Sequence, residues 1–419
     1  MLTQWFDPEP GPASLPGVYA REFSRRGHDV SVLTGYPNYP DGVLHPGYKI
    51  RRRSRATVDG VDITRVALYP NHSASSLGRI ANYASFALSA TASGASALRN
   101  VDAVWVYNSP VSVSLPLLTH TRMGRTPIFL HVQDLWPDSL IESGMFPGGR
   151  AGAVAANLID RVVRLTESKA AVVGISSAGL REVIADRHPR LDLSKIAYVP
   201  NPTNEALFRP AATLRDELGI AEPHAQDVEV MYAGAVGEVQ GLQTLVDAAQ
   251  ILQASAHIRF TIVGDGIGRE RLERQANELG LRNIRFLGRV PQSSIPGLVA
   301  ASAIQLASLA PAPFLSYTTP SKIASLLASG VPIIGHLEGD GAALIRSAGA
   351  GVVVRPGDAA ELASAIESVA NGGPPLWERM GRSGRDYYEQ NLSTTAISSR
   401  ILELLAPHVG HSNSTKESL

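Results

Sequence analysis

The amino-acid sequence predicts an α/β protein made of two domains, each built around a parallel β-sheet. Short runs of β-branched and aromatic residues alternate with longer helical patterns along the whole chain, which is typical of βαβ units. The pattern restarts after residues 201–204, and the 419 residues exceed the size of one ordinary domain. A hydrophobic content of 44% with 18% charged residues is the balance of a globular protein and excludes wholesale disorder.

In the first half, the alternation predicts a series of strands connected by amphipathic helices. The strands are predicted at residues 2–6, 29–34, 61–67, 103–107, 127–132, 171–175 and 195–199. The helices are predicted at residues 15–26, 76–98 and 151–165. Residues 51–55 carry four arginines and are expected to form a solvated loop or a minor anion patch.

In the second half, further strands and helices define a second open sheet. The strands are predicted at residues 228–232, 258–263, 284–287, 303–307, 332–335 and 351–354, and the helices at 242–254, 268–279 and 321–328. A long helical pattern at 376–405 follows, and the polar residues 410–419 are expected to form a flexible tail. The predicted domains span residues 1–204 and 205–389, with a linker at 204–210.

The composition excludes several classes of function. The chain has 38 Lys and Arg against 38 Asp and Glu, so its overall charge would not bind nucleic acid or an anionic membrane. It has no cysteine, which excludes disulfides, thiolate metal sites and cysteine nucleophiles. The apolar runs are shorter than the roughly 18 residues of a transmembrane helix. Because no secretory leader begins the chain, a cytoplasmic protein is expected.

Motifs of metal, hydrolase and redox chemistry are also missing from the sequence. None of the 18 aspartates forms an Asp-x-Asp pair, so no metal–diphosphate site of that kind is expected. The signatures of zincins, serine hydrolases and P-loop NTPases do not occur. The glycines at residues 264–268 have the wrong spacing for a dinucleotide fingerprint, and no acidic ribose ligand follows. A redox enzyme is therefore not expected.

The strongest local motif begins at Thr319. This residue suits the N-cap of a helix, Pro320 suits the first helical position, and Gly330 suits the residue that ends the helix. The helix start would combine free backbone N–H groups with the Ser321 hydroxyl and the Lys322 ammonium, which together can bind phosphate. An ordinary capped surface helix is an equally acceptable interpretation of so short a motif.

Glycine-rich turns follow three successive predicted strands of the second half. Residues 234–242 follow the first of these strands, Gly264 follows the second, and Gly288-Arg289-Val290 follows the third. Glycine lets the backbone approach a ligand closely, and open α/β sheets bind ligands at the carboxyl ends of their strands. One such turn is a weak signal, but several turns at one edge predict a binding crevice.

The first half offers two segments that would reach the same crevice. The proline-rich residues 8–14 join the first strand to the first helix and are expected to shape its wall. Asp134 follows the strand at 127–132 and is expected to project into the crevice, whereas Trp136 would serve in packing. A helix N-cap is an alternative role for Asp134.

The order and spacing of these segments resemble those of a known enzyme family. The matching segments are residues 26–40, 133–137, 200–201, 239–241, 263–266, 320–322, 328–332 and 349–353. They resemble the retaining nucleotide-sugar glycosyltransferases of the GT-B type, family 4, and within it the WbuB-like subgroup that transfers amino or deoxy sugars. The resemblance implies two facing Rossmann-like domains, with a C-terminal helix at about residues 390–408 that crosses back to the first domain.

The chain departs from the pattern of this family at five side chains. Two family glutamates, one facing the donor sugar and one usually holding the ribose, correspond to Tyr317 and Ser325. The family Arg and Lys that grip the diphosphate are missing, with Glu238 and Gln240 nearby instead. The histidine that often precedes the aspartate is Gln133 here. These departures keep a non-catalytic relative open as an alternative.

The resemblance implies roles for individual residues. Lys322 would meet the leaving diphosphate, and Asp134 and Gln133 would complete the catalytic set near the acceptor. The expected donor-binding residues are Gly237, Gln240, Gly264, Arg289, Val290, Tyr317, Ser321 and Ser325. The expected acceptor-binding residues are Glu9, Gly11, Tyr36, Asn38 and Asn108.

The expected function is metal-independent, retaining transfer of a sugar from a GDP- or UDP-linked donor to a small soluble acceptor. The acceptor nucleophile would be a hydroxyl, an amine or a thiol, and the arginine-rich composition favours a role in specialised metabolism. No cofactor, metal or nucleic-acid partner is expected, and the oligomeric state stays open. The alternatives are a lipid-linked or cell-surface glycan acceptor, a GT-B-fold epimerase, and a non-catalytic binding subunit.

Overall fold

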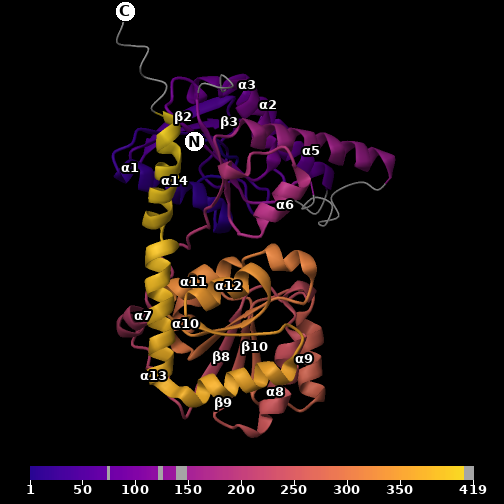
Figure 1. The fold of residues 1–419 in the computed structure, drawn as a ribbon, viewed down its shortest axis with the longest axis vertical. Coiled ribbons are helices and arrows are strands. Elements are labelled where there is room, and N and C mark those ends of the chain that lie inside the picture. Colours follow the sequence, from indigo (N-terminus) through magenta and orange to yellow (C-terminus); the bar gives the residue numbers. More distant parts are fainter. Residues whose placement is uncertain (73–75, 121–125, 138–148, 410–419) are drawn as a thin grey trace, which may run out of the picture. The chain divides into compact units, whose positions relative to one another are not determined.

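The computed structural model describes residues 1–72, 76–120, 126–137 and 149–409 (Figure 1). The chain divides into two compact units. The first unit comprises residues 1–176, 180–200 and the chain from Ile397 onward, and the second comprises residues 177–179 and 201–396. Each unit is a Rossmann-like α/β structure, so the predicted fold class is confirmed. The units meet in the sequence at residues 200 and 201, where the prediction put the boundary at 204.

The sheet of the first unit is organised around the N-terminal segment. Leu2 forms parallel bridges with Leu33 and with Val106, and it thereby links two groups of strands. One group has the order β1-β3-β2 and the other the order β4-β5-β6-β7. The predicted strand at 2–6 is thus reduced to a short central segment. The strands are β1 (Val30–Gly35), β2 (Arg53–Val58), β3 (Val61–Val66), β4 (Val104–Asn108), β5 (Ile128–Val132), β6 (Val172–Ile175) and β7 (Ile196–Tyr198).

Strand β2 corrects the expectation of a loop at residues 51–55. It pairs antiparallel with β3 and forms the edge of its group. Its residues are half-buried or exposed, and Arg53 and Arg55 both donate to the hydroxyl of Ser96. An edge strand tolerates such charged side chains, so it lacks the alternation of polar and apolar residues that makes a strand recognisable.

The helices of the first unit include two short ones that were not predicted, α3 and α6. The predicted helix at 76–98 ends at Ser93 and continues as a separate 3₁₀ turn at Ala95–Leu98. Among the helices of the described residues, none has the length and hydropathy that crossing a bilayer requires. The helices of this unit are α1 (Leu15–Arg25), α2 (Ser76–Ser93), α3 (Ser114–His120), α5 (Arg150–Lys169) and α6 (Leu180–Arg187).

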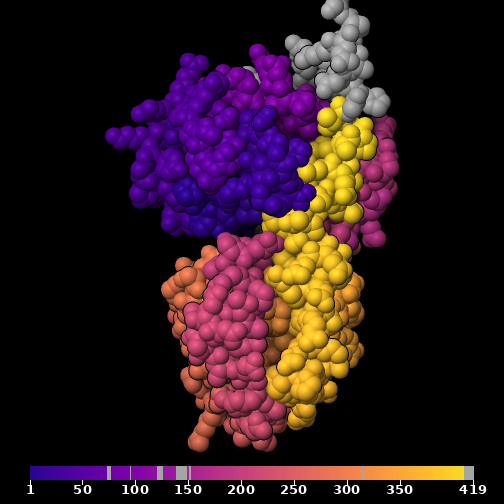
Figure 2. All heavy atoms as spheres, turned by 90° about the vertical axis from the view of Figure 1, so that its left-hand side faces the viewer, coloured from indigo at the N-terminus to yellow at the C-terminus, as the bar shows by residue number. Residues whose placement is uncertain are grey.

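The C-terminal helix α14 (Thr394–Val409) returns to the first unit, as predicted. Ile397, Ile401 and Leu405 form one apolar stripe because they are four residues apart. They are buried in a cluster that contains Trp5 and Tyr19. The yellow atoms of α14 accordingly lie against the indigo atoms of the N-terminal segment (Figure 2).

The second unit contains a fully parallel sheet of order β10-β9-β8-β11-β12-β13, the 3-2-1-4-5-6 order of a Rossmann fold. Its strands are β8 (Val228–Ala233), β9 (Ile258–Val263), β10 (Ile284–Gly288), β11 (Ile304–Ser308), β12 (Ile333–His336) and β13 (Gly351–Val354). Its helices are α7 (Ala211–Leu218), α8 (Gln243–Ile251), α9 (Arg269–Glu278), α10 (Ile295–Ala301), α11 (Ser321–Ser329), α12 (Gly339–Ser347) and α13 (Ala359–Asn391). Of these, α7, α10 and α12 were not predicted.

Candidate active site

The glycine-rich loops of the second unit meet at the carboxyl edge of its sheet. The order of the strands reverses between β8 and β11, and Rossmann sheets bind ligands at such a switch point. The loops after β8 and β9 approach so closely that a Cβ on Gly264 would lie 1.8 Å from the Gly234 carbonyl oxygen. Gly264 also donates to the Gly288 carbonyl at 2.8 Å. The predicted convergence of these loops is therefore observed.

Helix α11 begins at Ser321, one residue after Pro320, the predicted first helical position. Its N-cap is Pro320, and no side chain caps the helix. Thr319 was predicted as the N-cap, but its hydroxyl instead shares a hydrogen bond of 2.9 Å with Ser177. The predicted helix end is confirmed, because Gly330 adopts the left-handed conformation with φ 67°. The first turn of α11 therefore leaves backbone donors that no side chain satisfies.

Lys322 lies in this first turn and reaches the loop after β8. Its Nζ sits 3.6 Å from the centroid of the Tyr232 ring, and a Cβ on Gly234 would lie 2.8 Å from it. The stem of Lys322 keeps some exposure, whereas its Nζ is buried. Among the residues that the structure describes, this Nζ finds no hydrogen-bond partner. Burial lowers the pKa of Lys322 to about 7.

A buried ammonium without a hydrogen-bond partner is costly unless something neutralises it. The Tyr232 ring offers only a cation–π contact, which is weaker than an ion pair. An anionic ligand at this edge would supply the missing charge and would also meet the backbone donors of α11. The arrangement is therefore suited to a phosphate or diphosphate group.

The loop after β8 is held by one hydrogen bond within the loop and by one from the segment after β11. The N–H of Gly237 donates to Oε1 of Gln240 at 3.0 Å, and Ala310 donates to the Val239 carbonyl at 2.8 Å. Gly237 was expected to bind the donor, but its amide is satisfied within the loop. A ligand that takes this amide has to displace the Gln240 side chain.

The two positions that replace the family glutamates differ in their surroundings. The Ser325 hydroxyl shares a hydrogen bond of 2.7 Å with the Thr203 hydroxyl. The Thr203 N–H donates to the Tyr388 hydroxyl, which in turn donates to Glu205 at 3.0 Å. Tyr317 ends a 3₁₀ turn and is 37% exposed. Ser325 is thus anchored to a chain segment far away in the sequence, an arrangement that the sequence did not indicate.

Three other predicted donor residues lie at the same edge of the sheet. Ser321 is exposed at the start of α11, and Arg289 is exposed directly after β10. Val290 is half-buried and packs against the apolar core beneath α11. The predicted donor residues thus either follow the carboxyl ends of strands β8 to β11 or lie on α11.

The predicted catalytic residues of the first unit follow β5. Ser109, which follows β4, donates to Oδ2 of Asp134 at 2.8 Å. Burial raises the pKa of Asp134, and this hydrogen bond opposes the rise. Gln133 is half-buried beside it in the sequence. Asp134 is therefore held by a hydroxyl after a parallel strand and does not act as a helix cap in the described residues.

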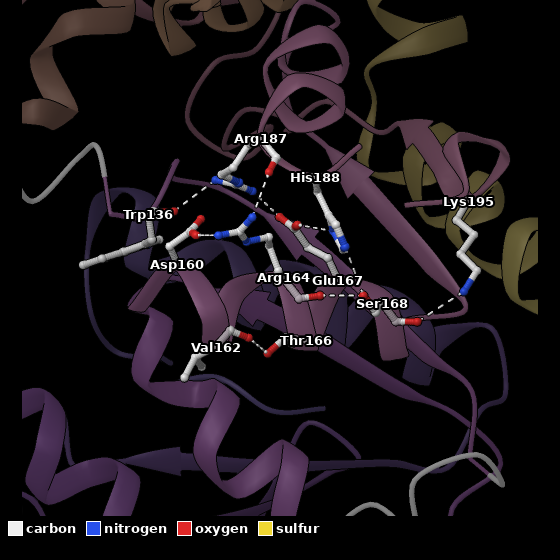
Figure 3. A network of polar contacts seen from close by, with 10 residues as sticks. All are labelled: Trp136, Asp160, Val162, Arg164, Thr166, Glu167, Ser168, Arg187, His188 and Lys195. Atoms are coloured by element: carbon white, nitrogen blue, oxygen red, sulfur yellow. Dashed lines mark hydrogen bonds and ion pairs between the residues drawn. The ribbon is translucent and has the colours of Figure 1, made fainter. Parts of the chain in front are cut away.

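An ionic network around the buried Glu167 holds the Trp136 backbone, two residues after Asp134 in the sequence (Figure 3). Arg187 at the end of α6 donates to the Trp136 carbonyl at 3.0 Å and pairs with Glu167 of α5. His188 Nδ1 lies 3.5 Å from Glu167 Oε2. Trp136 is buried against Val163, which confirms its predicted packing role. These charged residues lie far from Asp134 in the sequence, and no local motif marks them.

Of the predicted acceptor residues, Glu9 and Asn38 serve within the fold. Glu9 is 2% exposed and accepts N–H hydrogen bonds from Phe6, Asn38 and Tyr39 at 2.9, 2.8 and 3.0 Å. Asn38 is 1% exposed and donates to the Tyr36 carbonyl. Burial raises the pKa of Glu9, and the three N–H donors oppose that rise. These two side chains shape the loops and present no free group to an acceptor.

The other predicted acceptor residues have different environments. Tyr36 is buried, and its hydroxyl donates to Ser54 at 2.9 Å. Gly11 starts the 3₁₀ turn Gly11–Ser14 with φ +64°. Asn108 ends β4, and within the described residues its buried Oδ1 has no hydrogen-bond partner. Asn108 is therefore the stronger candidate for contact with a ligand.

A Rossmann sheet is suited to binding a phosphorylated ligand when a buried lysine at its switch point has no hydrogen-bond partner, as is the case for Lys322 among the described residues. Two family models that match the chain identify the kind of protein more closely. Residues 227–371 match the family described as "Glycosyl transferases group 1", and residues 13–202 match the "Glycosyl transferase 4-like domain". The chain belongs to the GT-B glycosyltransferases of family 4, and it is an enzyme of the glycosyltransferase class.

Individual relatives agree with this membership. The chain is 26% identical over 347 residues to the putative colanic acid biosynthesis glycosyl transferase WcaI of Escherichia coli, covering 76% of this chain and 78% of that protein. It is 26% identical to the alpha-D-kanosaminyltransferase of Streptomyces kanamyceticus, covering 45% of this chain and 47% of that one. The crystal structure of Anabaena HepE in complex with UDP matches with a TM-score of 0.65 at 18% identity, covering 97% of this chain and 98% of that chain.

Proposed function

We propose that this glycosyltransferase is a retaining, metal-independent enzyme that uses a nucleoside-diphosphate sugar as its donor. The observation that carries the proposal is the buried Nζ of Lys322, which has a ring contact but no hydrogen-bond partner among the described residues. It lies in the first turn of α11 at the switch point of the sheet. The related HepE was solved with UDP, which supports a nucleoside diphosphate as the ligand here.

In the proposed reaction, the bond between the sugar C1 and the diphosphate oxygen breaks while the acceptor oxygen, nitrogen or sulfur bonds to C1 from the same face. The acceptor proton passes to the departing phosphate oxygen. Lys322 and the first-turn N–H groups of α11 stabilise the charge that develops on the diphosphate, which is the kind of fixed electrostatic stabilisation that lowers a barrier by several kcal/mol. A protein cation at this point can take the place that a metal has in other transferases. Asp134 orients the acceptor through its carboxylate.

For the acceptor, we favour a small soluble molecule. Helix α2 carries a single charged residue, Arg79, which is too little for electrostatic docking on an anionic membrane. A relative from Streptomyces kanamyceticus that is 23% identical over 228 residues is named a 2-deoxystreptamine glucosyltransferase, and the 2-deoxystreptamine in this name supports a small-molecule acceptor.

A lipid-linked or cell-surface glycan is a second candidate acceptor. The match to WcaI, a protein named for colanic acid biosynthesis, favours it. Leu77 and Leu88 on α2 are also 79% and 63% exposed, and such side chains can enter a lipid interface. Flotation with anionic liposomes at physiological salt separates the two: a soluble-acceptor enzyme stays with the unbound protein, whereas co-migration of most of the protein supports the second candidate.

Turnover with a panel of UDP- and GDP-linked sugars tests the proposed donor. A transferase releases nucleoside diphosphate, and NMR of the product reports whether the anomeric configuration is kept. An epimerase would change the sugar without releasing nucleoside diphosphate, and a binding subunit would bind the nucleotide without turnover. Either of these results, or an inverted product, contradicts the proposal.

A further inference from the structure

A line of hydrogen bonds runs along the carboxyl edge of the second unit's sheet and touches four neighbouring strands. Ser308, the last residue of β11, donates to the carbonyl of Gln240 at 2.6 Å in the loop after β8. The same hydroxyl lies 2.9 Å from Nδ1 of His336, the last residue of β12. Gly357, which follows β13, donates its N–H to Nε2 of His336 at 2.8 Å.

The directions of these hydrogen bonds fix the tautomer of His336. The Gly357 N–H can only donate, so Nε2 is the accepting, unprotonated nitrogen. The Gln240 carbonyl can only accept, so it takes the single hydroxyl proton of Ser308. The Ser308 oxygen must then accept from His336, which places the proton on Nδ1. Ser308 and His336 are both 1% exposed, and burial lowers the pKa of His336 to about 4, which is consistent with a neutral ring.

The sheet itself does not hold the loop after β8 against β11. The ladder between β8 and β11 contains only the pairs Ile304 with Val230 and Gln305 with Met231. Beyond these pairs the ladder does not continue toward the carboxyl ends of the two strands, which form the switch point of the sheet. Two hydrogen bonds connect the loop after β8 to the end of β11 and the segment after it. Ser308 donates to the Gln240 carbonyl, and Ala310 donates to the Val239 carbonyl.

We propose that His336 is a positioning residue for the diphosphate-binding loop and acts through Ser308 as the neutral Nδ1–H tautomer. Ser308 fixes the Gln240 carbonyl, and Gln240 in turn holds the Gly237 amide. Lys322 lies against Gly234 at the start of the same loop. His336 therefore sets the distance between this loop and Lys322 without touching the ligand. This inference rests on the proposed donor site.

Two substitutions at His336 separate its two hydrogen bonds. His336→Asn places an amide N–H near the position of Nδ1 and keeps the donor to Ser308, whereas His336→Phe keeps the ring shape and removes both bonds. We expect His336→Phe to raise the donor KM at least about tenfold with a smaller change in kcat, and His336→Asn to stay within about threefold of the parent. Ser308→Ala should match His336→Phe, and the double variant should be no worse than either, since both break one chain of bonds.

Two measurements on the protein without donor are independent of turnover. NMR of the imidazole nitrogens should show a protonated Nδ1 and an unprotonated Nε2 for His336. Hydrogen exchange at the Gly237 and Gly241 amides should be at least about tenfold faster in His336→Phe than in the parent. A protonated Nε2, or unchanged loop exchange in His336→Phe, overturns the positioning role. Failure of every donor to react overturns the proposed function instead and leaves these two readouts intact.

Discussion

The ammonium of Lys322 lies 3.6 Å from the centre of the Tyr232 ring, while the Tyr232 hydroxyl donates to the Ala235 carbonyl at 2.7 Å. One aromatic side chain at the end of β8 thus supports the lysine with its face and the glycine-rich loop with its hydroxyl. The lysine and the loop are linked through this ring before any ligand arrives. In the proposed donor site, the Lys322 ammonium therefore has an aromatic ring beside it and no hydrogen-bond partner among the described residues.

The first prediction concerns proton uptake on nucleotide binding. Burial lowers the pKa of Lys322 to about 7, so the free protein loses the charged form as the pH rises through 7. A diphosphate binds the charged form, so affinity is greatest below this pKa and falls about tenfold per pH unit above it, until the pKa of the complex is reached. Calorimetry with UDP and GDP at pH 7.5 and 8.5, in buffers of different ionisation enthalpy, should show uptake of up to one proton. Equal affinity at both pH values contradicts this role of Lys322.

The second prediction concerns Ser325. Its hydroxyl already bonds to Thr203, and Glu205 lies one hydrogen bond further along the same chain through Tyr388. Ser325→Glu should therefore not improve donor affinity, and it should lower stability by about 1–3 kcal/mol because a half-buried carboxylate lacks a partner. Ser325→Ala is the matched control and should cost about 1 kcal/mol with little change in affinity. A clear gain in donor affinity for Ser325→Glu would show that the pocket keeps the ordinary family geometry.

The third prediction concerns Asp134 and Ser109. Burial raises the pKa of Asp134, and the Ser109 hydroxyl lowers it again by donating to the carboxylate. If the ionised carboxylate orients the acceptor, activity is lost as the pH falls through this pKa. Ser109→Ala should move that acid limb of the pH–rate profile to higher pH, and Asp134→Asn should abolish the limb and most of the activity. An acid limb that is unchanged in Ser109→Ala refutes the assignment.

The fourth prediction concerns the buried network of Figure 3. Burial raises the pKa of Glu167 from 4.5 to about 7, although Arg187 attracts the charged form. The folded state therefore binds more protons than the unfolded state between these two values, so the contribution of Glu167 to stability falls as the pH rises from 4.5 to 7. The change is at most roughly 3 to 4 kcal/mol, at 1.36 kcal/mol per pKa unit.

Melting temperatures at pH 5 and pH 7.5 test this contribution. The stability of the parent relative to Glu167→Gln should be greater at pH 5 than at pH 7.5. The control is Glu182→Gln, which changes an exposed glutamate on α6 and should show no such dependence. The same difference at both pH values would mean that Arg187 keeps Glu167 ionised throughout.

Much of the fold followed from local patterns in the sequence. The strands of both sheets have β-branched, apolar runs between glycine and proline, and the start of α11 is marked by Pro320-Ser321-Lys322. Helix α10 was missed because it is seven residues long and contains proline and glycine, which suggest a loop. Strand β2 was missed because its polar edge residues have no alternation.

The site was only partly predictable for a different reason. Lys322 and the glycine loops belong to short contiguous motifs, so the sequence marks them. The partners that complete the site lie far away along the chain: Thr203 is 122 residues from Ser325, and Ser308 is 28 residues from His336. A pair of side chains at such separations leaves no periodic or spacing signal. Single turns of the chain can be predicted from the sequence. The hydrogen bonds that connect these turns to one another become visible only in the folded structure.

Turnover of Lys322→Ala is the direct measurement of whether the Lys322 ammonium stabilises the leaving diphosphate. Removing one preorganised donor from a leaving-group site costs about a hundredfold or more in rate. With the donor that the parent enzyme uses best, release of nucleoside diphosphate should therefore fall at least about a hundredfold in Lys322→Ala. The control Lys49→Ala, which removes an exposed lysine of the first unit, should retain the parent rate. Near-parental turnover by a folded Lys322→Ala protein would show that Lys322 does not stabilise the leaving diphosphate.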